Sequence, residues 1–259
     1  MSSPTVLVER RQAVAVVTLN RPDAANTFNL EMGRALFDVA SALELDVSVR
    51  AVVITGAGST FCLGGDLHGM VKSGADIAGY LRDLTAALHA ALICFMRMRA
   101  PVIAAVNGVA AGAGIGLVAI SDLVIAAERA KFTSAYTGVA LTPDAGTSHM
   151  LPRVIGLRRA AEMILTNRVL LAAEALDWGL VNRVVPDGEL IDTAISLAEK
   201  MATGPLGALA EAKRLLSPAI GELERHLALE RETIATTAAT AEGREGVRAF
   251  LEKRKAIYP

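Results

Sequence analysis

The sequence predicts an α/β fold with parallel strands, followed by a helical C-terminal segment. Up to about residue 147, short runs rich in β-branched residues alternate with segments of helical spacing, a pattern typical of layered α/β proteins. Beyond that point almost every periodic segment has helical spacing. No Pro- or Ser-rich linker divides the 259 residues. We therefore expect one structural domain, with a core over 1–200 and a helical C-terminal subdomain over 201–259.

The first half contains four predicted strands, rich in Val, Ile and Ala. The run at 14–19 ends in Asn-Arg-Pro and the run at 50–55 in Gly-Ala-Gly, as strands commonly do. Two further strands are predicted over 102–106 and 123–127. Helices are predicted over 30–45, over 76–98 before Pro101, and from a glycine loop through Ile120.

The second half is predicted to be mainly helical. Apolar residues recur there at intervals of three and four positions, which is typical of amphipathic helices. The predicted helices cover 158–165, 172–178, 189–202, 206–216, 222–240 and 242–256, and only 181–185 has the pattern of a strand.

The bulk composition excludes several classes of function. The formal net charge is −1 and no basic block occurs, which argues against a nucleic-acid or membrane-surface partner. Cys62 and Cys94 have neither metal nor redox spacing, which fits a reducing cytoplasm, and no signal peptide is evident. Residues 101–120 contain only Asn107 as a polar side chain and are long enough to span a bilayer. Their Ala, Gly and Val content favours a buried strand, loop and helix instead.

Two glycine-rich loops follow predicted strands and suit an anionic oxygen. One contains Gly64 and Gly65, and the other contains Gly112 and Gly114. Glycine lets a ligand approach the backbone closely, and helix N-termini direct N–H groups toward negative charge. Two such loops from neighbouring strands would direct two N–H groups at one oxygen. The alternative is that these glycines only permit tight turns and that Asp66 is a plain helix N-cap.

Two competing motifs are poorly matched. A dinucleotide fingerprint beginning at Gly112 needs a third glycine at position 117, which is Leu. The acidic residue expected about 20 positions further on is poorly matched by Asp122 or Glu128. No Gly-x-Ser-x-Gly nucleophile motif occurs, so a nicotinamide dehydrogenase and a serine esterase are both disfavoured.

The segment Thr-Pro-Asp-Ala-Gly-Thr at 142–147 places one carboxylate, Asp144, on a turn downstream of both glycine loops. An exposed aspartate has a pKa of about 3.9 and is a poor base at neutral pH. Apolar neighbours such as Val139 and Leu141 would raise that pKa toward a useful range. The alternative is that Asp144 caps a following helix. The four histidines have no metal spacing; we interpret them as surface or core residues, with His149 the most ambiguous, and expect no metal site.

Taken together, these segments resemble the crotonase superfamily, the enoyl-CoA hydratase/isomerase family, over nearly the whole chain. Several motifs are loose individually, but their order and spacing are specific for this family. The matching segments are 19–22 (Leu-Asn-Arg-Pro), 61–67 (Phe-Cys-Leu-Gly-Gly-Asp-Leu), 101–108 (Pro-Val-Ile-Ala-Ala-Val-Asn-Gly), 121–126, 151–153, 179–181 and 250–254.

The resemblance implies a spiral of ββα units with a helical C-terminal trimerisation region, assembled as a homotrimer or as a hexamer. It also implies an acyl-CoA thioester substrate whose oxygen lies between the backbone N–H groups of Gly65 and Ala113. Coenzyme A is then part of the substrate, and no cofactor is implied. Ala24 and Ala25 stand where relatives often have a basic residue, and Lys253 would contact a phosphate from a neighbouring subunit. The residues implied to bind substrate are Ala25, Leu63, Gly64, Asp66, Leu67, Val109, Gly112, Tyr136, Leu141 and Lys253.

The chain departs from the hydratases of this family in its acids. Those hydratases use two glutamates, whose positions fall here on Gly116 and Tyr136. Asp144 instead matches the position of the acid in isomerases, dienoyl-CoA isomerases and a dehalogenase branch. Its surroundings most resemble the isomerase branch that contains the ring-epoxide isomerase of phenylacetyl-CoA breakdown.

The resemblance thus implies an acyl-CoA isomerase that works through a thioester enolate. Asp144 would move the proton, and Gly65 and Ala113 would hold the enolate oxygen. An enoyl-CoA hydratase and a catalytically silent acyl-CoA-binding protein are the alternatives. The sequence does not identify the acyl group.

Overall fold

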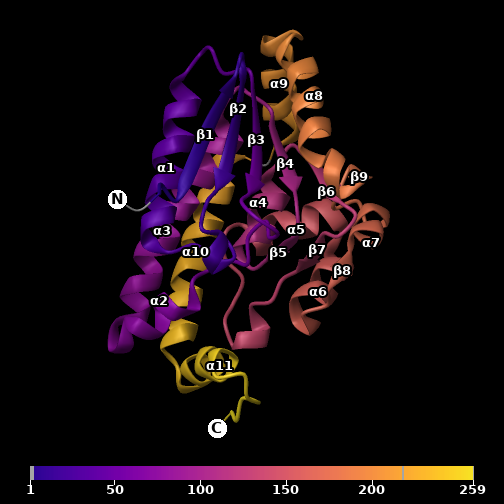
Figure 1. Ribbon diagram of the computed structural model, residues 1–259. Coiled ribbons are helices and arrows are strands. Elements are labelled where there is room, and N and C mark those ends of the chain that lie inside the picture. Colours follow the sequence, from indigo (N-terminus) through magenta and orange to yellow (C-terminus); the bar gives the residue numbers. More distant parts are fainter. Residues whose placement is uncertain (1–2, 218, 259) are drawn as a thin grey trace.

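The computed structural model describes residues 3–217 and 219–258, which form two β-sheets surrounded by helices (Figure 1). The larger sheet has the strand order β1-β2-β3-β4-β6-β9, and the smaller has the order β5-β7-β8. Neighbours in the larger sheet are parallel except for β1 and β2. The strands are β1 (Val6–Arg11), β2 (Val14–Leu19), β3 (Ala51–Gly56), β4 (Val102–Val106), β5 (Val109–Ala111), β6 (Leu123–Ala127), β7 (Lys131–Thr133), β8 (Leu170–Leu171) and β9 (Arg183–Val185).

The central strands of the larger sheet are buried on both faces, because successive residues of a strand point to opposite sides. In β3, Ala51 and Val53 pack with α8 (Leu190–Ala202). Val52 and Ile54 belong to the core on the other side. That side is covered by α1 (Leu30–Leu45), α3 (Ile77–Arg97) and α4 (Ala113–Ile120). Burial on both faces explains why these strands are continuous apolar runs in the sequence.

Three successive segments repeat the order strand, strand, helix, which confirms the predicted spiral of ββα units. One unit consists of β4, β5 and α4, and the next of β6, β7 and α5 (Thr147–Ile155). In the preceding unit, β3 is followed by Cys62, which forms a single bridge to Ala110 of β5, and then by α2 (Leu67–Lys72). Because the strands of these units are parallel, the turns that follow them collect at the carboxyl end of the larger sheet.

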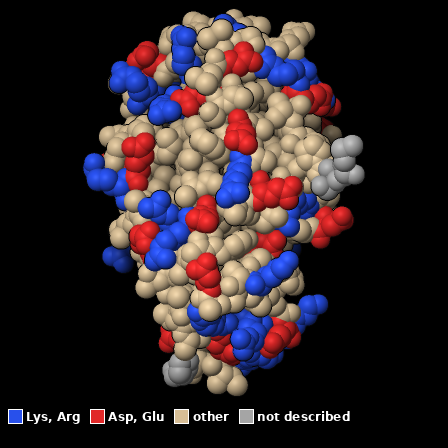
Figure 2. All heavy atoms as spheres, turned by 90° about the vertical axis from the view of Figure 1, so that its left-hand side faces the viewer, with Lys and Arg blue, Asp and Glu red and all other residues tan. Residues whose placement is uncertain are grey.

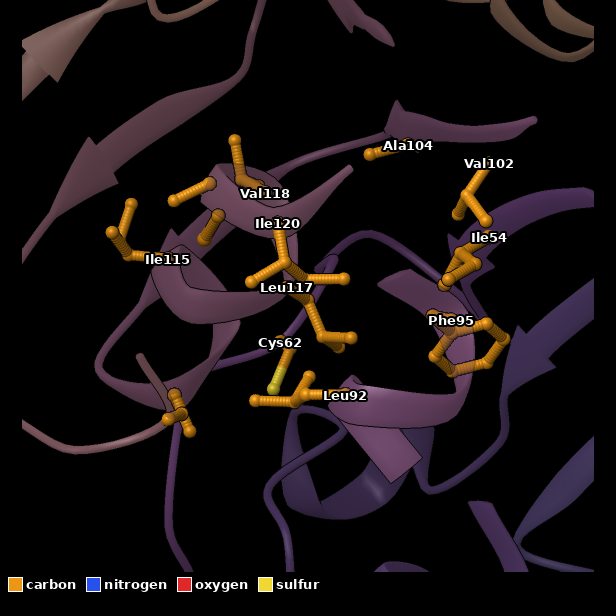
Figure 3. Close-up of a cluster of buried hydrophobic side chains, with 14 of the residues drawn as sticks. Ile54, Cys62, Leu92, Phe95, Val102, Ala104, Ile115, Leu117, Val118 and Ile120 are labelled. Atoms are coloured by element: carbon orange, nitrogen blue, oxygen red, sulfur yellow. The ribbon is translucent and has the colours of Figure 1, made fainter. Parts of the chain in front are cut away.

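Helix α3 occupies the centre of the helical layer, between α1 and α10 (Ile220–Ala239). Figure 3 shows Leu92 and Phe95 of α3 close to Leu117 of α4 in the buried cluster. Helix α10 adds Leu223 and Leu227 to the same cluster. The C-terminal segment is therefore continuous with the core through α10, and the subdomain boundary at residue 200 stays a prediction.

Most predicted helices and strands agree with the structure within two residues. The helix predicted to reach residue 256 is too long, because α11 ends at Leu251 and Lys253 adopts a φ of 52°. Four strands were not predicted: β1 is largely exposed, and β5, β7 and β8 have only two or three residues each. The remaining helical elements are η1 (Pro22–Ala24), η2 (Gly74–Asp76), η3 (Thr137–Val139), α6 (Leu157–Thr166), α7 (Ala172–Asp177), η4 (Asp187–Glu189), α9 (Leu206–Leu216) and α11 (Ala241–Leu251).

The apolar segment 101–120 is not one long helix, because it contains β4, β5 and α4. A different segment, Gly74–Arg97, is long and apolar enough to cross a membrane by length and composition alone. However, 56% of its most apolar window is buried inside the protein, where α3 lies between α1 and α10. This segment therefore has the features of a core helix.

Charged side chains of both signs are spread over the face of the molecule drawn in Figure 2. Lys and Arg side chains lie beside Asp and Glu side chains over most of this face, in keeping with a formal net charge of −1.

Candidate active site

A cavity of about 630 Å³ lies beside the two glycine loops, which is a typical size for a ligand pocket. Most of its lining is apolar, with Leu81, Leu84 and Leu88 of α3 buried. Its ionisable side chains form an exposed or half-buried group and a buried group. The first group is Arg21, Asp23, Asp66 and His68, and the second is Tyr136 and Asp144. The cavity thus has a charged mouth and an apolar interior that holds one carboxyl and one phenol.

The first glycine loop exposes the backbone of Gly65 to the cavity. Phe28 and Gly65 form a parallel bridge in which the Phe28 N–H donates to Gly64 O at 2.7 Å and the Asp66 N–H donates to Phe28 O at 2.9 Å. A bridge of this kind uses the groups on either side of Gly65, so the Gly65 N–H points away from Phe28. Gly64 has a φ of 92°, a left-handed conformation that favours glycine.

The second glycine loop places another free donor beside the first. Gly112 is the N-cap of α4, so Ala113 is the first helical residue, and its N–H has no partner within the helix. The two loops touch: a Cβ atom on Gly64 would lie 3.1 Å from Gly112 Cα and 3.2 Å from Ala113 N. Gly65 and Ala113 both line the cavity, which is the juxtaposition that an oxyanion site requires.

Asp144 lies in the buried part of the cavity and is 5% exposed. The Tyr136 hydroxyl donates a hydrogen bond to Asp144 Oδ1. Burial raises the pKa of Asp144 to about 6, and the Tyr136 hydrogen bond opposes that rise. Burial and the neighbouring carboxylate raise the pKa of Tyr136 well above its usual value, so the phenol keeps its proton. The alternative role as a helix cap is wrong, because Gly146 is the N-cap of α5 and the Asp144 side chain does not cap it.

The turn that carries Asp144 is held by residues that the sequence analysis did not assign to the site. His89 Nε2 of α3 accepts a hydrogen bond from Ala145 N at 3.1 Å. Burial lowers the pKa of His89 to about 3, so the ring is neutral and can accept. Glu230 of α10 accepts from Gly146 N at 2.8 Å and from Ser148 N at 3.0 Å.

Glu230 itself belongs to a buried polar cluster. Its Oε1 accepts the Ser148 hydroxyl at 2.5 Å, and Ser148 Oγ lies 2.8 Å from Nε2 of His226. Burial raises the pKa of Glu230 to about 7, and the Ser148 hydrogen bond opposes that rise. The rings of His149 and His226 are 4.8 Å apart. No local motif marks this cluster, because its members come from two segments of the chain almost eighty residues apart.

Gly116 of α4 is packed directly against the same turn. A Cβ atom at this position would lie 2.3 Å from Ala145 O and 2.7 Å from Ala145 Cβ. The space that a side chain at Gly116 would need is therefore filled by the residue next to Asp144. The two positions where the resemblance places hydratase glutamates thus hold a blocked glycine and the phenol that donates to Asp144.

Asp66 is the N-cap of α2, as its position predicts, and also forms an ion pair. Its Oδ1 accepts from Gly69 N at 3.2 Å, and its Oδ2 lies 3.0 Å from Arg21 Nη2. Arg21 thus places a guanidinium in the cavity lining, and its charge is paired with that of Asp66. Most of the residues predicted to bind substrate or take part in catalysis line the cavity, namely Ala25, Leu63, Gly65, Asp66, Leu67, Gly112, Ala113, Tyr136, Leu141 and Asp144. Gly64 is outside the lining but packs against Gly112, which is part of it. Val109 and Lys253 also lie outside the lining of this chain.

Sequence comparisons identify the family of the chain. A family model described as Enoyl-CoA hydratase/isomerase matches residues 9–259. The chain is 40% identical over 254 residues to a 1,2-epoxyphenylacetyl-CoA isomerase of Escherichia coli (strain K12), covering 96% of each chain. It is 38% identical over 256 residues to a probable enoyl-CoA hydratase of Rhodobacter capsulatus, covering 98% of this chain and 97% of the relative.

Solved structures give the same result for the fold. The crystal structure of an enoyl-CoA hydratase/isomerase from Pseudoalteromonas atlantica T6c superposes with a TM-score of 0.87 at 32% identity, covering 98% of this chain and all of the other. The similarity extends over nearly the whole length, in sequence and in structure. The protein therefore belongs to the enoyl-CoA hydratase/isomerase family, whose crotonase fold it has.

Proposed function

We propose that this protein is an acyl-CoA isomerase that works through a thioester enolate. The observation that carries the proposal is one buried carboxylate, Asp144, in a cavity that Gly65 and Ala113 also line, and their backbone N–H groups have no hydrogen-bond partner among the described residues. A base and an oxyanion site are the two components that enolate chemistry requires. The pKa of about 6 makes Asp144 a stronger base than an exposed aspartate while leaving it ionised at neutral pH.

In the proposed reaction, the Asp144 carboxylate takes a proton from the carbon alpha to the thioester carbonyl. The electron pair of that C–H bond forms the enolate, and the N–H groups of Gly65 and Ala113 stabilise the charge on its oxygen. Protonated Asp144 then returns the proton farther along the acyl chain. The double bond moves, no atom is gained or lost, and the reaction consumes neither oxidant nor reductant.

Hydration of an enoyl-CoA is the second candidate, because the relatives include probable hydratases. Two features make it the weaker one. A second carboxylate is absent from the cavity interior within the residues described, and Gly116 has no room for a side chain. A protein that binds acyl-CoA without chemistry is the third candidate, and it does not account for the raised pKa of a buried carboxyl in the cavity.

The cavity interior supports an uncharged hydrocarbon as the acyl group. Aliphatic side chains from α3 and α10, such as Leu84, Leu88 and Ile234, line it, and the guanidinium of Arg21 is at the mouth. Burying a carboxylate in such surroundings without a partner is costly. We expect kcat/KM to be at least about 100-fold lower for an enoyl-CoA that ends in a carboxylate than for one of equal length that ends in a methyl group. Equal values for the two substrates would exclude this acyl class.

The test of the reaction type is alpha-proton exchange into deuterated water, followed by NMR with saturated and 3-enoyl thioesters of coenzyme A. We expect exchange by the native protein and a loss of about 10²–10⁴-fold in Asp144→Asn. Asp38→Asn, an exposed aspartate on α1, is the matched control. Unchanged exchange in Asp144→Asn would reject Asp144 as the base. Rapid water addition to crotonyl-CoA would favour the hydratase, and binding without exchange would favour the silent binder.

The proposed assembly is a homotrimer or a hexamer of this chain. Large apolar side chains that are more than half exposed support an additional buried interface. They include Leu157, Leu165 and Leu171 around α6, and Leu215 and Leu216 on α9. Light scattering in solution tests the proposal, because one chain has a mass of 27.1 kDa and the two assemblies contain three or six.

A further inference from the structure

The turn that carries Asp144 has an uncommon backbone conformation. Ala145 has a φ of 55° and Gly146 a φ of 75°, so two successive residues are left-handed. A residue with a side chain seldom adopts this conformation unless its surroundings impose it. The surroundings here are hydrogen-bond acceptors: His89 Nε2 for the Ala145 N–H and Glu230 Oε2 for the Gly146 N–H.

Glu230 makes most of these contacts. It is 4% exposed, and its two oxygens receive three donors within one turn of chain: Gly146 N, Ser148 N and Ser148 Oγ, at 2.8, 3.0 and 2.5 Å. It does not line the cavity, but Ile234, one helical turn further along α10, does. Helix α10 therefore contacts both the acyl cavity and the turn that presents Asp144.

We infer that Glu230 is a positioning residue that fixes the carboxylate of Asp144 against the substrate by holding the 144–148 turn from α10. This inference rests on the proposed function, because it assumes that Asp144 transfers the proton. Proton transfer depends steeply on alignment, and a displacement of about 1 Å costs roughly 100-fold in rate. Glutamate suits the position because its ionised carboxylate offers only acceptors, whereas a glutamine amide always presents two N–H groups to a turn that itself donates.

The test compares Glu230→Gln with Glu224→Gln, an exposed glutamate on the same helix. Two quantities are measured for each: alpha-proton exchange of a saturated acyl-CoA, and the Kd of that thioester. For Glu230→Gln we expect exchange to fall about 10–100-fold with Kd changed less than about two-fold, since the cavity wall stays in place. Glu224→Gln is expected to match the native protein in both quantities.

Three outcomes separate the inference from the proposed function. If Asp144→Asn abolishes exchange and Glu230→Gln leaves it unchanged, the positioning role is rejected and the proposed reaction stands. If Asp144→Asn leaves exchange unchanged, both are rejected. Equal losses of exchange and of affinity in Glu230→Gln would also reject the positioning role, because they indicate general disruption of the fold.

Ser148→Ala provides a second variant in case Glu230→Gln does not fold. It removes the hydroxyl donor to Glu230 and keeps both backbone hydrogen bonds. We expect Ser148→Ala to lose about three-fold in exchange, which is less than the loss expected for Glu230→Gln, again with an unchanged Kd. Exchange equal to that of the native protein in Ser148→Ala would count against the role of this cluster.

Discussion

The two sides of the cavity are built in different ways. The oxyanion side consists of one glycine loop shortly before α2 and another directly after β5, and its geometry comes from backbone contacts between Gly64 and Gly112. The Asp144 side is a turn with two left-handed residues, held by His89 and Glu230 from helices that are distant in sequence. One side is therefore built from backbone contacts between two glycine motifs, and the other is held by buried side chains of distant helices. Changes to the first should affect charge stabilisation alone, whereas changes to the second should affect pH dependence and stability as well.

Apart from the loss of Asp144 itself, the largest effect is expected from removal of one oxyanion donor. Ala113→Pro deletes the N–H of the first residue of α4, a position where proline is well tolerated in a helix. We expect kcat for exchange to fall by about 10²–10³-fold, or roughly 3–4 kcal/mol, with little change in the melting temperature.

A matched control for this variant is Ala241→Pro. Ala241 is likewise the first residue of a helix, α11, but it is exposed and outside the cavity. Full activity in Ala241→Pro together with full activity in Ala113→Pro would contradict the oxyanion role of the second loop.

The next effect concerns the stability cost of a buried carboxylate. The pKa of Asp144 is raised in the folded state from 3.8 to about 6, so the protonated carboxyl stabilises the fold below about pH 4. That contribution is lost as the pH rises through 6. We expect Asp144→Asn to gain stability relative to the native protein between pH 4 and pH 7, by about 2–3 kcal/mol at most.

Urea unfolding at pH 4 and at pH 8 measures this difference. The variant and the native protein should differ less at pH 4 than at pH 8, with the variant the more stable at pH 8. A difference in stability that is independent of pH would show that burial does not raise the pKa of Asp144.

A smaller effect is expected from loss of the phenol. Tyr136→Phe removes the hydrogen bond that lowers the pKa of Asp144, so the acidic limb of the pH–rate profile should move up by about one pH unit. The rate should therefore fall up to about ten-fold near pH 6 and much less near pH 9. Tyr80→Phe is the control, since Tyr80 does not line the cavity. An acidic limb that stays in place would show that Tyr136 does not act on Asp144.

The same division explains what could be predicted from the sequence. The strands over 14–19 and 102–106, the glycine loops and the position of Asp144 are marked by local residue patterns, and the structure places the loops and Asp144 around one cavity. Glu230 could not be found in this way, because its partners lie more than eighty positions away. His89 was similarly hidden, since a histidine within an apolar helix has no local signal that distinguishes a core residue from one that holds a turn.

The contact between Gly116 and the Ala145 carbonyl also limits how this protein can change over evolution. A glutamate introduced at position 116 would collide with backbone only 2.3 Å from its first side-chain atom, so it would disrupt the fold before it offered a second acid. The 142–148 segment would have to take another path first, and that step would displace Asp144. Relatives with two catalytic acids and relatives with one would therefore be separated by an intermediate whose fold is disrupted. Laboratory evolution of this chain toward hydration should need coupled changes in α4 and the turn. Libraries that vary position 116 alone should yield no variant with hydratase activity.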